Sequence, residues 1–397
     1  MRLAVAIVLA VGVGAVVALA GSNGEPAGRS GDVRADGRGD ATSPATQGRG
    51  DVAPRPVLLV RRIGELPAPV LRRAHDLVGA DRVSIGSARR VALGSSRTAG
   101  GAIVDRPPPG FGIPLELVAI EPRTYAPLVP PAARDAIRGL GRGEALLTRT
   151  AARLRRLGPG GRIRLAEGRT LRVAGVIDDG LVRRAEIVVS AVEGASLGAH
   201  RRWVLVPYSG DPVGMARSLQ RAGGRELRVR DLGRAPWSSF LQILPQAALK
   251  ERFGEFAVRL GSSGRNVVVE PRWVERNIVA ASVPILGSVS CHREMIPALR
   301  RALSELKRRG LGRLVDPSDY AGCYAAKDIP TTGGISRHAW GLATDFNAAA
   351  NPYGSPSRQD QRLVEVMERN GFAWGGRWPT PDAMHFEYVG KQPAAGA

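Results

Sequence analysis

The spacing of apolar side chains divides the chain into two folded modules. An apolar run at residues 57–60 is typical of a strand, residues 67–78 have apolar side chains at helical spacing, and residues 82–93 alternate like a strand. The same order of strand, helix and strand returns at residues 203–207, 212–222 and 226–230. The pattern predicts an α+β module over residues 55–235, in which two β-α-β units flank a small β-insert.

The β-insert is predicted from short helical and strand-like patterns of apolar residues. Residues 145–157 have a helical pattern that ends at Gly158-Pro159-Gly160-Gly161. Strand-like patterns occupy residues 115–120, 162–165, 170–177 and 185–189. We therefore expect one helix among several short strands.

A hinge rich in proline and tryptophan, at about residues 235–239, precedes a second module over residues 240–391. Its clearest elements are two helices, at residues 294–309 and 363–370, each followed directly by a glycine. Residues 249–260 are also predicted to be helical, and residues 266–270 to form a strand.

The first 54 residues lack the pattern of a folded module. Arg2 precedes an apolar and glycine-rich run over residues 3–20, which predicts a signal peptide or an N-terminal membrane anchor. Residues 21–54 contain almost no large apolar side chain, so we expect a disordered linker. The folded modules are therefore predicted to be extracytoplasmic, either secreted or anchored by residues 3–20.

The formal net charge is +21, and almost all the positive charge comes from arginine. Such a charge favours anionic partners, for example an anionic cell-wall polymer, although arginine usage set by base composition explains much of it. No basic run is interleaved with aromatic residues and no nucleic-acid-binding motif is present, so nucleic acid is not an expected partner.

The chain has two cysteines, Cys291 and Cys323. In an exported protein such a pair predicts a disulfide, here closing a loop of about 31 residues and contributing about 3–4 kcal/mol. Two separate buried thiols are the alternative.

The candidate chemistry lies near the C-terminus. His338 is followed seven residues later by Asp345, and His385 lies between Asp382 and Glu387. A catalytic zinc site takes three nitrogen or oxygen ligands, leaves a position for water and needs a general base. His338, Asp345 and His385 are the candidate ligands. Asp382 and Glu387 are the candidate bases, Glu387 because it shares a strand face with His385.

Two motifs, Ser-x-His-x-x-Gly-x-Ala-x-Asp at residues 336–345 and Asp-x-x-His-Phe-Glu at residues 382–387, resemble those of the VanY-type zinc peptidases. That family includes D-Ala-D-Ala carboxypeptidases and L-alanyl-D-glutamate endopeptidases with the hedgehog/DD-peptidase fold, and the resemblance covers residues 240–390. It implies a peptidoglycan stem peptide as substrate.

The resemblance also implies roles for individual residues. His338, Asp345 and His385 would bind Zn²⁺. Asp382 would be the general base that deprotonates a zinc-bound water, and Glu387 would support the site. Ser336 would contact the substrate, and Tyr324 and Arg337 are further candidates for substrate binding.

One position departs from the family pattern. Members of this subtype usually have arginine in a Cys-Tyr-x-x-Arg segment, where it stabilises the oxyanion, whereas this chain has Cys323-Tyr324-Ala325-Ala326-Lys327. Lysine keeps the positive charge but loses the bidentate geometry. In other enzymes, the loss of one hydrogen-bond donor to the oxyanion costs about 100-fold in rate. Lys327 is therefore expected to be a weaker catalytic residue, or Arg337 replaces it. A surface lysine without a catalytic role is the alternative.

The first module resembles, more diffusely, the extracytoplasmic domain of MacB/FtsX-type permeases. The likeness lies in Glu144-Ala145-Leu146-Leu147-Thr148, Leu157-Gly158-Pro159-Gly160 and Leu171-Arg172-Val173-Ala174-Gly175-Val176. Because that domain mediates protein contacts, the resemblance implies a protein partner for residues 55–235 and no catalytic residue.

The sequence therefore predicts an exported zinc peptidase that hydrolyses amide bonds of peptidoglycan stem peptides, as a D,D-carboxypeptidase or an L,D-endopeptidase. Two alternatives stay open. A non-catalytic protein that binds the cell wall or organises a complex would keep the peptidase fold. A hydrolase of another small amide would use the same site.

Overall fold

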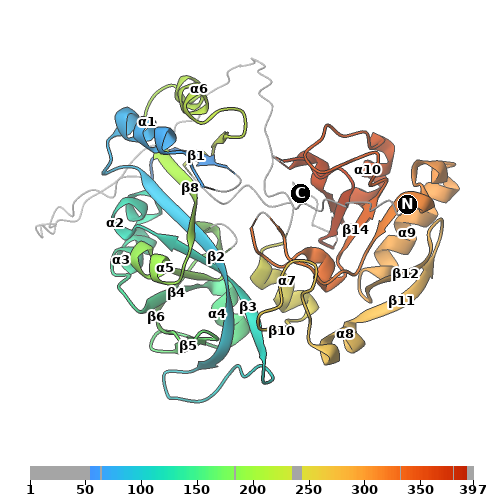
Figure 1. The fold of residues 1–397 in the computed structure, drawn as a ribbon, viewed down its shortest axis with the longest axis horizontal. Coiled ribbons are helices and arrows are strands. Elements are labelled where there is room, and N and C mark those ends of the chain that lie inside the picture. Colours follow the sequence, from blue (N-terminus) through green and yellow to red (C-terminus); the bar gives the residue numbers. More distant parts are fainter. Residues whose placement is uncertain are drawn as a thin grey trace, which may run out of the picture.

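The computed structural model describes residues 54–62, 65–182, 185–234, 244–330, 332–378 and 380–390. The predicted signal peptide or anchor, nearly all of the predicted linker and the hinge at residues 235–239 lie outside these ranges. None of the helices in these ranges could span a lipid bilayer. Helices and strands alternate along the chain, which confirms the predicted α+β class (Figure 1).

The two predicted β-α-β units form one antiparallel sheet. They consist of β1 (Val57–Arg61), α1 (Ala68–Val78), β2 (Ser84–Arg97), β8 (His200–Pro207), α6 (Pro212–Gly223) and β9 (Arg228–Asp231). The strands lie in the order β2-β8-β1-β9, which is the arrangement of a ferredoxin-like β-α-β-β-α-β sheet. Helices α1 and α6 cover one face of this sheet, where Val70 and Leu219 pack on Val60 and Val204.

The insert between the units closes into a small barrel. Its strands are β3 (Phe111–Ile120), β4 (Glu144–Thr148), β5 (Arg162–Leu165), β6 (Thr170–Ile177) and β7 (Ile187–Ser190). They follow the order β3-β7-β4-β6-β5-β2, and β2 pairs back with β3. Alternate residues of each strand fill the interior, for example Leu115 and Leu117 of β3 and Ile187 and Val189 of β7. Because β2 belongs to both parts, barrel and sheet are continuous.

Short helices and 3₁₀ turns connect the barrel strands. They are α2 (Pro122–Tyr125), η1 (Ala126–Leu128), α3 (Pro131–Arg138), α4 (Arg149–Arg155), η2 (Asp179–Leu181) and α5 (Ala191–Ser196). The helix predicted over residues 145–157 is wrong in its first part, because residues 144–148 form β4 and the helix begins at Arg149. Ala145 and Leu147 are buried inside the barrel, and a short apolar run of this kind fits a strand as well as a helix.

The second module contains a four-stranded sheet in the order β13-β14-β16-β15. The sheet strands are β13 (Tyr320–Gly322), β14 (Ala343–Phe346), β15 (Phe372–Trp374) and β16 (His385–Tyr388). Its helices are α7 (Gln246–Phe253), α8 (Pro271–Asn277), α9 (Ile296–Arg308) and α10 (Gln361–Arg369). A hairpin of β11 (Ile278–Val283) and β12 (Gly287–His292) precedes α9. The 3₁₀ turns are η3 (Gly312–Leu314), η4 (Pro317–Asp319), η5 (Arg337–Trp340) and η6 (Gly375–Arg377).

The two C-terminal helices predicted from their spacing are present as α9 and α10, and Leu299, Leu303, Leu363 and Met367 bury their apolar faces in one core. Two other predictions are wrong. The helix predicted over residues 249–260 ends at Phe253, and the strand predicted over residues 266–270 is reduced to one bridge between Val258 and Val269.

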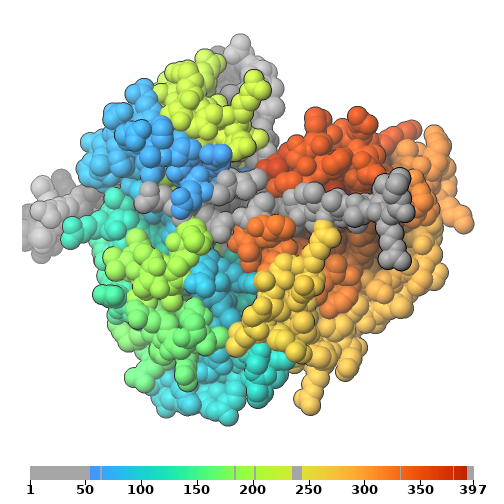
Figure 2. Space-filling view, viewed as in Figure 1, coloured from blue at the N-terminus to red at the C-terminus, as the bar shows by residue number. Residues whose placement is uncertain are grey.

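The segment after α7 joins the two modules. Residues 258–259 form β10, which pairs antiparallel with β3 of the barrel and so extends the sheet of the first module. In Figure 2 the yellow segment around α7 lies between the first module and the orange and red second module. The second module is thus docked on the barrel.

Candidate metal centre

The site is built on two neighbouring strands, β14 and β16. Asp345 and His385 lie directly opposite each other in the antiparallel register, which brings their Cβ atoms to within about 4.5–5.5 Å. Glu387 follows His385 by two residues and shares its face of the sheet. Phe386 lies on the opposite face and is buried in the core, so His385 and Glu387 are directed away from that core.

The turn η5 supplies the third residue, His338. Ser336 caps this turn, because its Oγ accepts a hydrogen bond from the His338 N–H at 3.3 Å. Gly341 ends the turn with φ = 64°, and a Cβ at this position would lie 2.6 Å from the backbone nitrogen of His292. Glycine is therefore required here, and it directs the chain into β14.

Three ligand atoms converge at one buried point. His338 Nε2 lies 3.1 Å from Asp345 Oδ2 and 3.2 Å from His385 Nδ1. His385 Nδ1 lies 2.9 Å from Asp345 Oδ1. One ligand atom from each residue falls within 4.8 Å of the others. Two imidazole nitrogens and a carboxylate oxygen in this arrangement fit the ligand set that Zn²⁺ prefers.

The outer nitrogen of each imidazole has its own acceptor. His338 Nδ1 donates to the Cys323 carbonyl at 2.7 Å, and His385 Nε2 donates to Glu387 Oε1 at 3.3 Å. These bonds leave the lone pairs of His338 Nε2 and His385 Nδ1 for a metal. Metal-binding histidines in proteins are commonly oriented by such a carbonyl or carboxylate.

The pKa shifts of the three side chains agree with this arrangement. Burial lowers the pKa of His338. Burial also disfavours the charged form of His385, but hydrogen bonds to Asp345 and Glu387 outweigh it and raise the pKa of His385 to about 10. The two imidazoles lower the pKa of Asp345 although its burial acts in the opposite direction. A cation would take the place of the proton on His385.

Asp382 is a buried carboxyl beside this cluster. Burial raises its pKa to about 7, while the charge of His385 acts in the opposite direction. Among the described residues its Oδ1 has no hydrogen-bond partner. A buried carboxylate oxygen without a partner is costly, so the site fits a further group, such as a cation with its water, that none of these residues supplies.

Glu387 lies on the outer side of His385. Its Oε2 is 3.6 Å from Arg337 Nε, and Arg337 Nη2 donates to the Leu244 carbonyl at 2.7 Å. Glu387 and Arg337 are both buried. The geometry is that of a carboxylate that orients a ligand, whereas a contact between Arg337 and substrate stays a prediction.

Lys327 is buried, with 7% of its surface exposed, so the alternative of a surface lysine is wrong. Burial lowers its pKa, and the carboxylates of Asp345 and Asp382 act in the opposite direction. The ammonium group is therefore close enough to the site to interact electrostatically with both carboxylates.

The two remaining candidates for substrate binding lie next to these residues. Ser336 is fully buried, and its hydroxyl serves as the cap of η5. Tyr324 is partly buried, which raises the pKa of its phenol, and its backbone N–H donates to the Ser290 carbonyl at 2.9 Å. A contact of either residue with substrate stays a prediction.

The predicted disulfide between Cys291 and Cys323 is present, with 5.4 Å between the two Cα atoms. It joins the end of β12 to the segment whose carbonyl orients His338. The pair is therefore part of the support of the metal centre.

One neighbour of the candidate ligands, in the segment from Gly371 to Trp378 before the second motif, has no role among the sequence-based expectations. The buried ring of Trp378 lies with its centroid 5.3 Å from that of His385. Its only signal in the sequence is a tryptophan after a Gly-Gly-Arg segment shortly before the second motif. The ring forms an apolar wall beside the ligand.

Part of the second module matches a known protein family. Residues 330–388 match the family model described as D-alanyl-D-alanine carboxypeptidase, and this segment includes both motifs but neither Lys327 nor the first module. No curated protein matches the chain. The hedgehog/DD-peptidase fold of the whole second module and the permease-like character of residues 55–235 stay predictions. The match confirms the resemblance of the C-terminal motifs: residues 330–388 carry the signature of the D-alanyl-D-alanine carboxypeptidase family.

Proposed function

We propose that the protein is an exported zinc peptidase that hydrolyses amide bonds in peptidoglycan stem peptides. The observation that carries the proposal is the convergence of His338 Nε2, Asp345 and His385 Nδ1, inside the segment that matches the carboxypeptidase family. A D,D-carboxypeptidase and an L,D-endopeptidase are both consistent with this site.

His338, Asp345 and His385 would hold the zinc ion. When bound, Zn²⁺ acts as a Lewis acid that lowers the pKa of water and polarises a carbonyl group. Glu387 and the Cys323 carbonyl keep both imidazoles in the tautomers that this binding requires.

Asp382 is the general base. It lies three residues before His385, is buried, and keeps one carboxylate oxygen without a hydrogen-bond partner among the described residues. This oxygen is available to accept the proton of the attacking water. The same carboxyl then passes the proton to the amine that leaves.

Lys327 stabilises the negative charge that develops on the carbonyl oxygen of the substrate. Its ammonium group is buried and interacts with Asp345 and Asp382, so its charge acts in a region from which water is largely removed. Because lysine offers one point charge instead of a bidentate fork, we expect a lower rate than in family members with arginine.

Export is supported by the pattern of residues 1–20 and by the disulfide between Cys291 and Cys323, since disulfides persist mainly in oxidising compartments. The N-terminus of the protein in the membrane and secreted fractions, determined by mass spectrometry, tests this part. Cleavage near residue 20 or an intact anchor is expected, and a protein found only in the cytoplasm with reduced cysteines would contradict export.

The peptidase proposal is tested with the purified protein and Asp382→Asn. We expect one zinc per chain in both, and release of D-alanine or peptides from peptidoglycan by the wild type only. The rate of Asp382→Asn should fall by about 10²–10⁴-fold, the usual contribution of a general base. Asp76→Asn, which changes an exposed carboxylate of α1, is the control and should leave the rate unchanged.

Two outcomes would refute the peptidase. Zinc at one per chain without cleavage, where a known carboxypeptidase of this family cleaves, would favour the non-catalytic wall-binding alternative. A wild-type protein that neither binds zinc nor cleaves would refute the metal site as well.

A further inference from the structure

Lys327 stands at one end of a short hairpin, and Ser336 stands at the other. The Ser336 N–H donates to the Lys327 carbonyl at 3.0 Å, and the Ile329 N–H donates to the Gly334 carbonyl at 2.7 Å. Asp328 and Ile335 form an antiparallel bridge between the two arms. Any movement of this hairpin would therefore displace the backbone of Lys327 and the cap of η5 together.

The hairpin is held from outside by an arginine of the first module. Arg90 lies on β2, and its guanidinium forms a bidentate ion pair with Asp328, the residue next to Lys327; the Nη2–Oδ2 distance is 3.2 Å. The Asp328 carboxylate is buried and also accepts a hydrogen bond from the Gly264 N–H at 3.1 Å. A bidentate guanidinium–carboxylate pair fixes orientation as well as distance.

A second contact supports the other arm. Glu116 on β3 is the direct partner of Arg90 in the antiparallel register. Its Oε1 lies 2.8 Å from the point where a Cβ on Gly334 would be, so the glycine permits close approach. Two neighbouring residues of the β2–β3 ladder thus contact the two arms of the hairpin.

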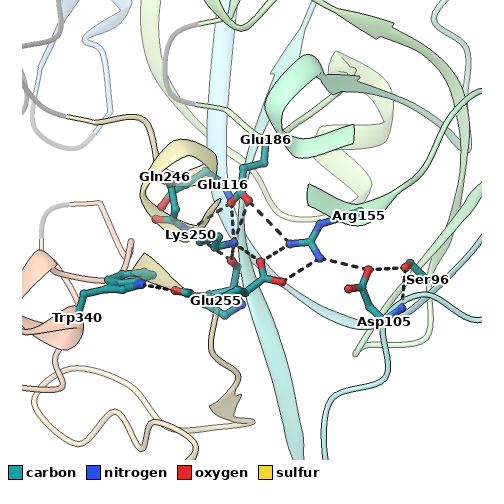
Figure 3. A network of polar contacts seen from close by, with 11 residues as sticks. Ser96, Asp105, Glu116, Arg155, Glu186, Gln246, Lys250, Glu255 and Trp340 are labelled. Carbon is teal, nitrogen blue, oxygen red and sulfur yellow. Dashed lines mark hydrogen bonds and ion pairs between the residues drawn. The ribbon is translucent and has the colours of Figure 1, made fainter. Parts of the chain in front are cut away.

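This ladder is fixed to the second module by a buried network of charges (Figure 3). Lys250 on α7 donates to Glu186 Oε1 at 2.8 Å and to the Pro114 carbonyl of β3 at 2.6 Å, and both charged side chains are fully buried. Glu186 Oε2 accepts the Glu116 N–H at 3.1 Å. The β2–β3 ladder therefore has a defined position relative to the metal centre.

We propose that Arg90 of the first module is a positioning residue for Lys327, and that the first module thereby completes the catalytic site of the second. This inference rests on the proposed peptidase function for its kinetic consequence. Arg90 does not touch the reacting atoms. It acts through Asp328, which holds the backbone from which the long side chain of Lys327 extends.

The kinetic prediction concerns Arg90→Ala and the milder Arg90→Lys. We expect Arg90→Ala to lower kcat by about 10-fold with little change in KM and in zinc content, since a misplacement of about 1 Å is enough for losses up to 10²-fold. Arg90→Lys keeps the charge and should recover part of the rate. In a Lys327→Ala background Arg90→Ala should lower kcat no further, because the residue that it positions is absent.

Arg153→Ala is the matched control. Arg153 also forms a bidentate pair across the same junction, with Glu251 on α7 at 2.6 and 2.9 Å, but Glu251 does not belong to the hairpin. This variant removes an arginine–carboxylate pair between the modules and should leave kcat unchanged. An equal loss in both variants would show that docking as such matters, and would overturn the specific role of Arg90.

Hydrogen exchange provides a readout that does not depend on peptidase activity. The amides of Ile329 and Ser336, which close the hairpin, should exchange about 10-fold faster in Arg90→Ala than in the wild type or Arg153→Ala, and at an intermediate rate in Arg90→Lys. Unchanged exchange would overturn the inference even if the protein proves not to be a peptidase. Faster exchange with unchanged kcat would also overturn it. A wild type without activity would refute the proposed function, and the exchange result alone would then decide the coupling.

Discussion

The two histidines of the candidate metal site present different nitrogens to it. His338 offers Nε2 because its Nδ1 donates to the Cys323 carbonyl, and His385 offers Nδ1 because its Nε2 donates to Glu387. The spacing of the motifs identifies both histidines but not the nitrogen that each one uses. For His338 the choice depends on the Cys323 carbonyl, which belongs to another segment. For His385 it depends on Glu387, two residues further along the same strand.

Replacing Glu387 by glutamine tests this arrangement at the scale of one residue. The amide can still accept a hydrogen bond but carries no charge, so it holds the His385 N–H less strongly. We expect zinc affinity to fall by about 10–100-fold, the usual cost of losing such a support, as measured by competition with a chelator. Glu365→Gln, an exposed position on α10, should have the affinity of the wild type. Equal affinities in all three proteins would contradict the role of Glu387.

At the scale of elements, His292 joins three parts of the second module. It ends β12, its Nε2 donates to the Phe253 carbonyl at the end of α7 at 3.2 Å, and its Nδ1 accepts the Glu294 N–H before α9 at 3.2 Å. Both bonds require the neutral imidazole with its proton on Nε2. Burial lowers the pKa of His292, which agrees with a neutral ring.

This histidine predicts a pH dependence of stability. Because its pKa is lower in the folded protein than in the unfolded chain, the unfolded chain binds more protons below about pH 6.5, and stability is lost as the pH falls. We expect the free energy of unfolding, measured by urea titration with a chelator present, to fall less steeply from about pH 7.5 to pH 5.5 in His292→Gln than in the wild type. Equal slopes would contradict the prediction.

The elements that the sequence predicts well are those whose own pattern decides their structure. Helices α9 and α10 are predicted by the helical spacing of their apolar residues and a glycine after the last turn. The β-α-β order of the first module is predicted because strand-like and helix-like spacings of apolar residues follow one another along the chain. Residues 144–148 form a strand because β6 and β7 lie on either side of them, and their own pattern contains no sign of these neighbours. In the site, local spacing predicts the three candidate ligands. It does not predict the contribution of Arg90, because 238 residues separate Arg90 from its partner Asp328.

At the scale of the whole molecule, the junction between the modules has the character of a protein interior. Arg155 is buried among Glu186, Glu255 and Asp105, and Lys250 shares Glu186 and Glu255 with it (Figure 3). Charges from both modules thus neutralise one another away from water. Separating the modules would require all of them to be hydrated again, so we expect the two modules to unfold together.

Lys250→Met tests this expectation. The substitution keeps the length and apolar stem of the side chain but leaves Glu186 buried without its closest cation, which typically costs about 3–5 kcal/mol. Thermal unfolding should change from one transition to two as the modules lose their coupling. Arg153→Ala, which breaks the exposed pair with Glu251, should retain one transition. A single transition at the wild-type temperature in Lys250→Met would refute the coupling.

The disulfide makes the geometry of the candidate metal site depend on oxidation of the two cysteines. Cys323 is tied to Cys291 through its side chain and orients His338 through its carbonyl, so one residue links thiol oxidation to ligand geometry. A newly made chain in a reducing environment lacks the bond that holds this carbonyl in place. We therefore expect the site to become ready for zinc only after oxidation, so that the proposed export would also activate the proposed peptidase.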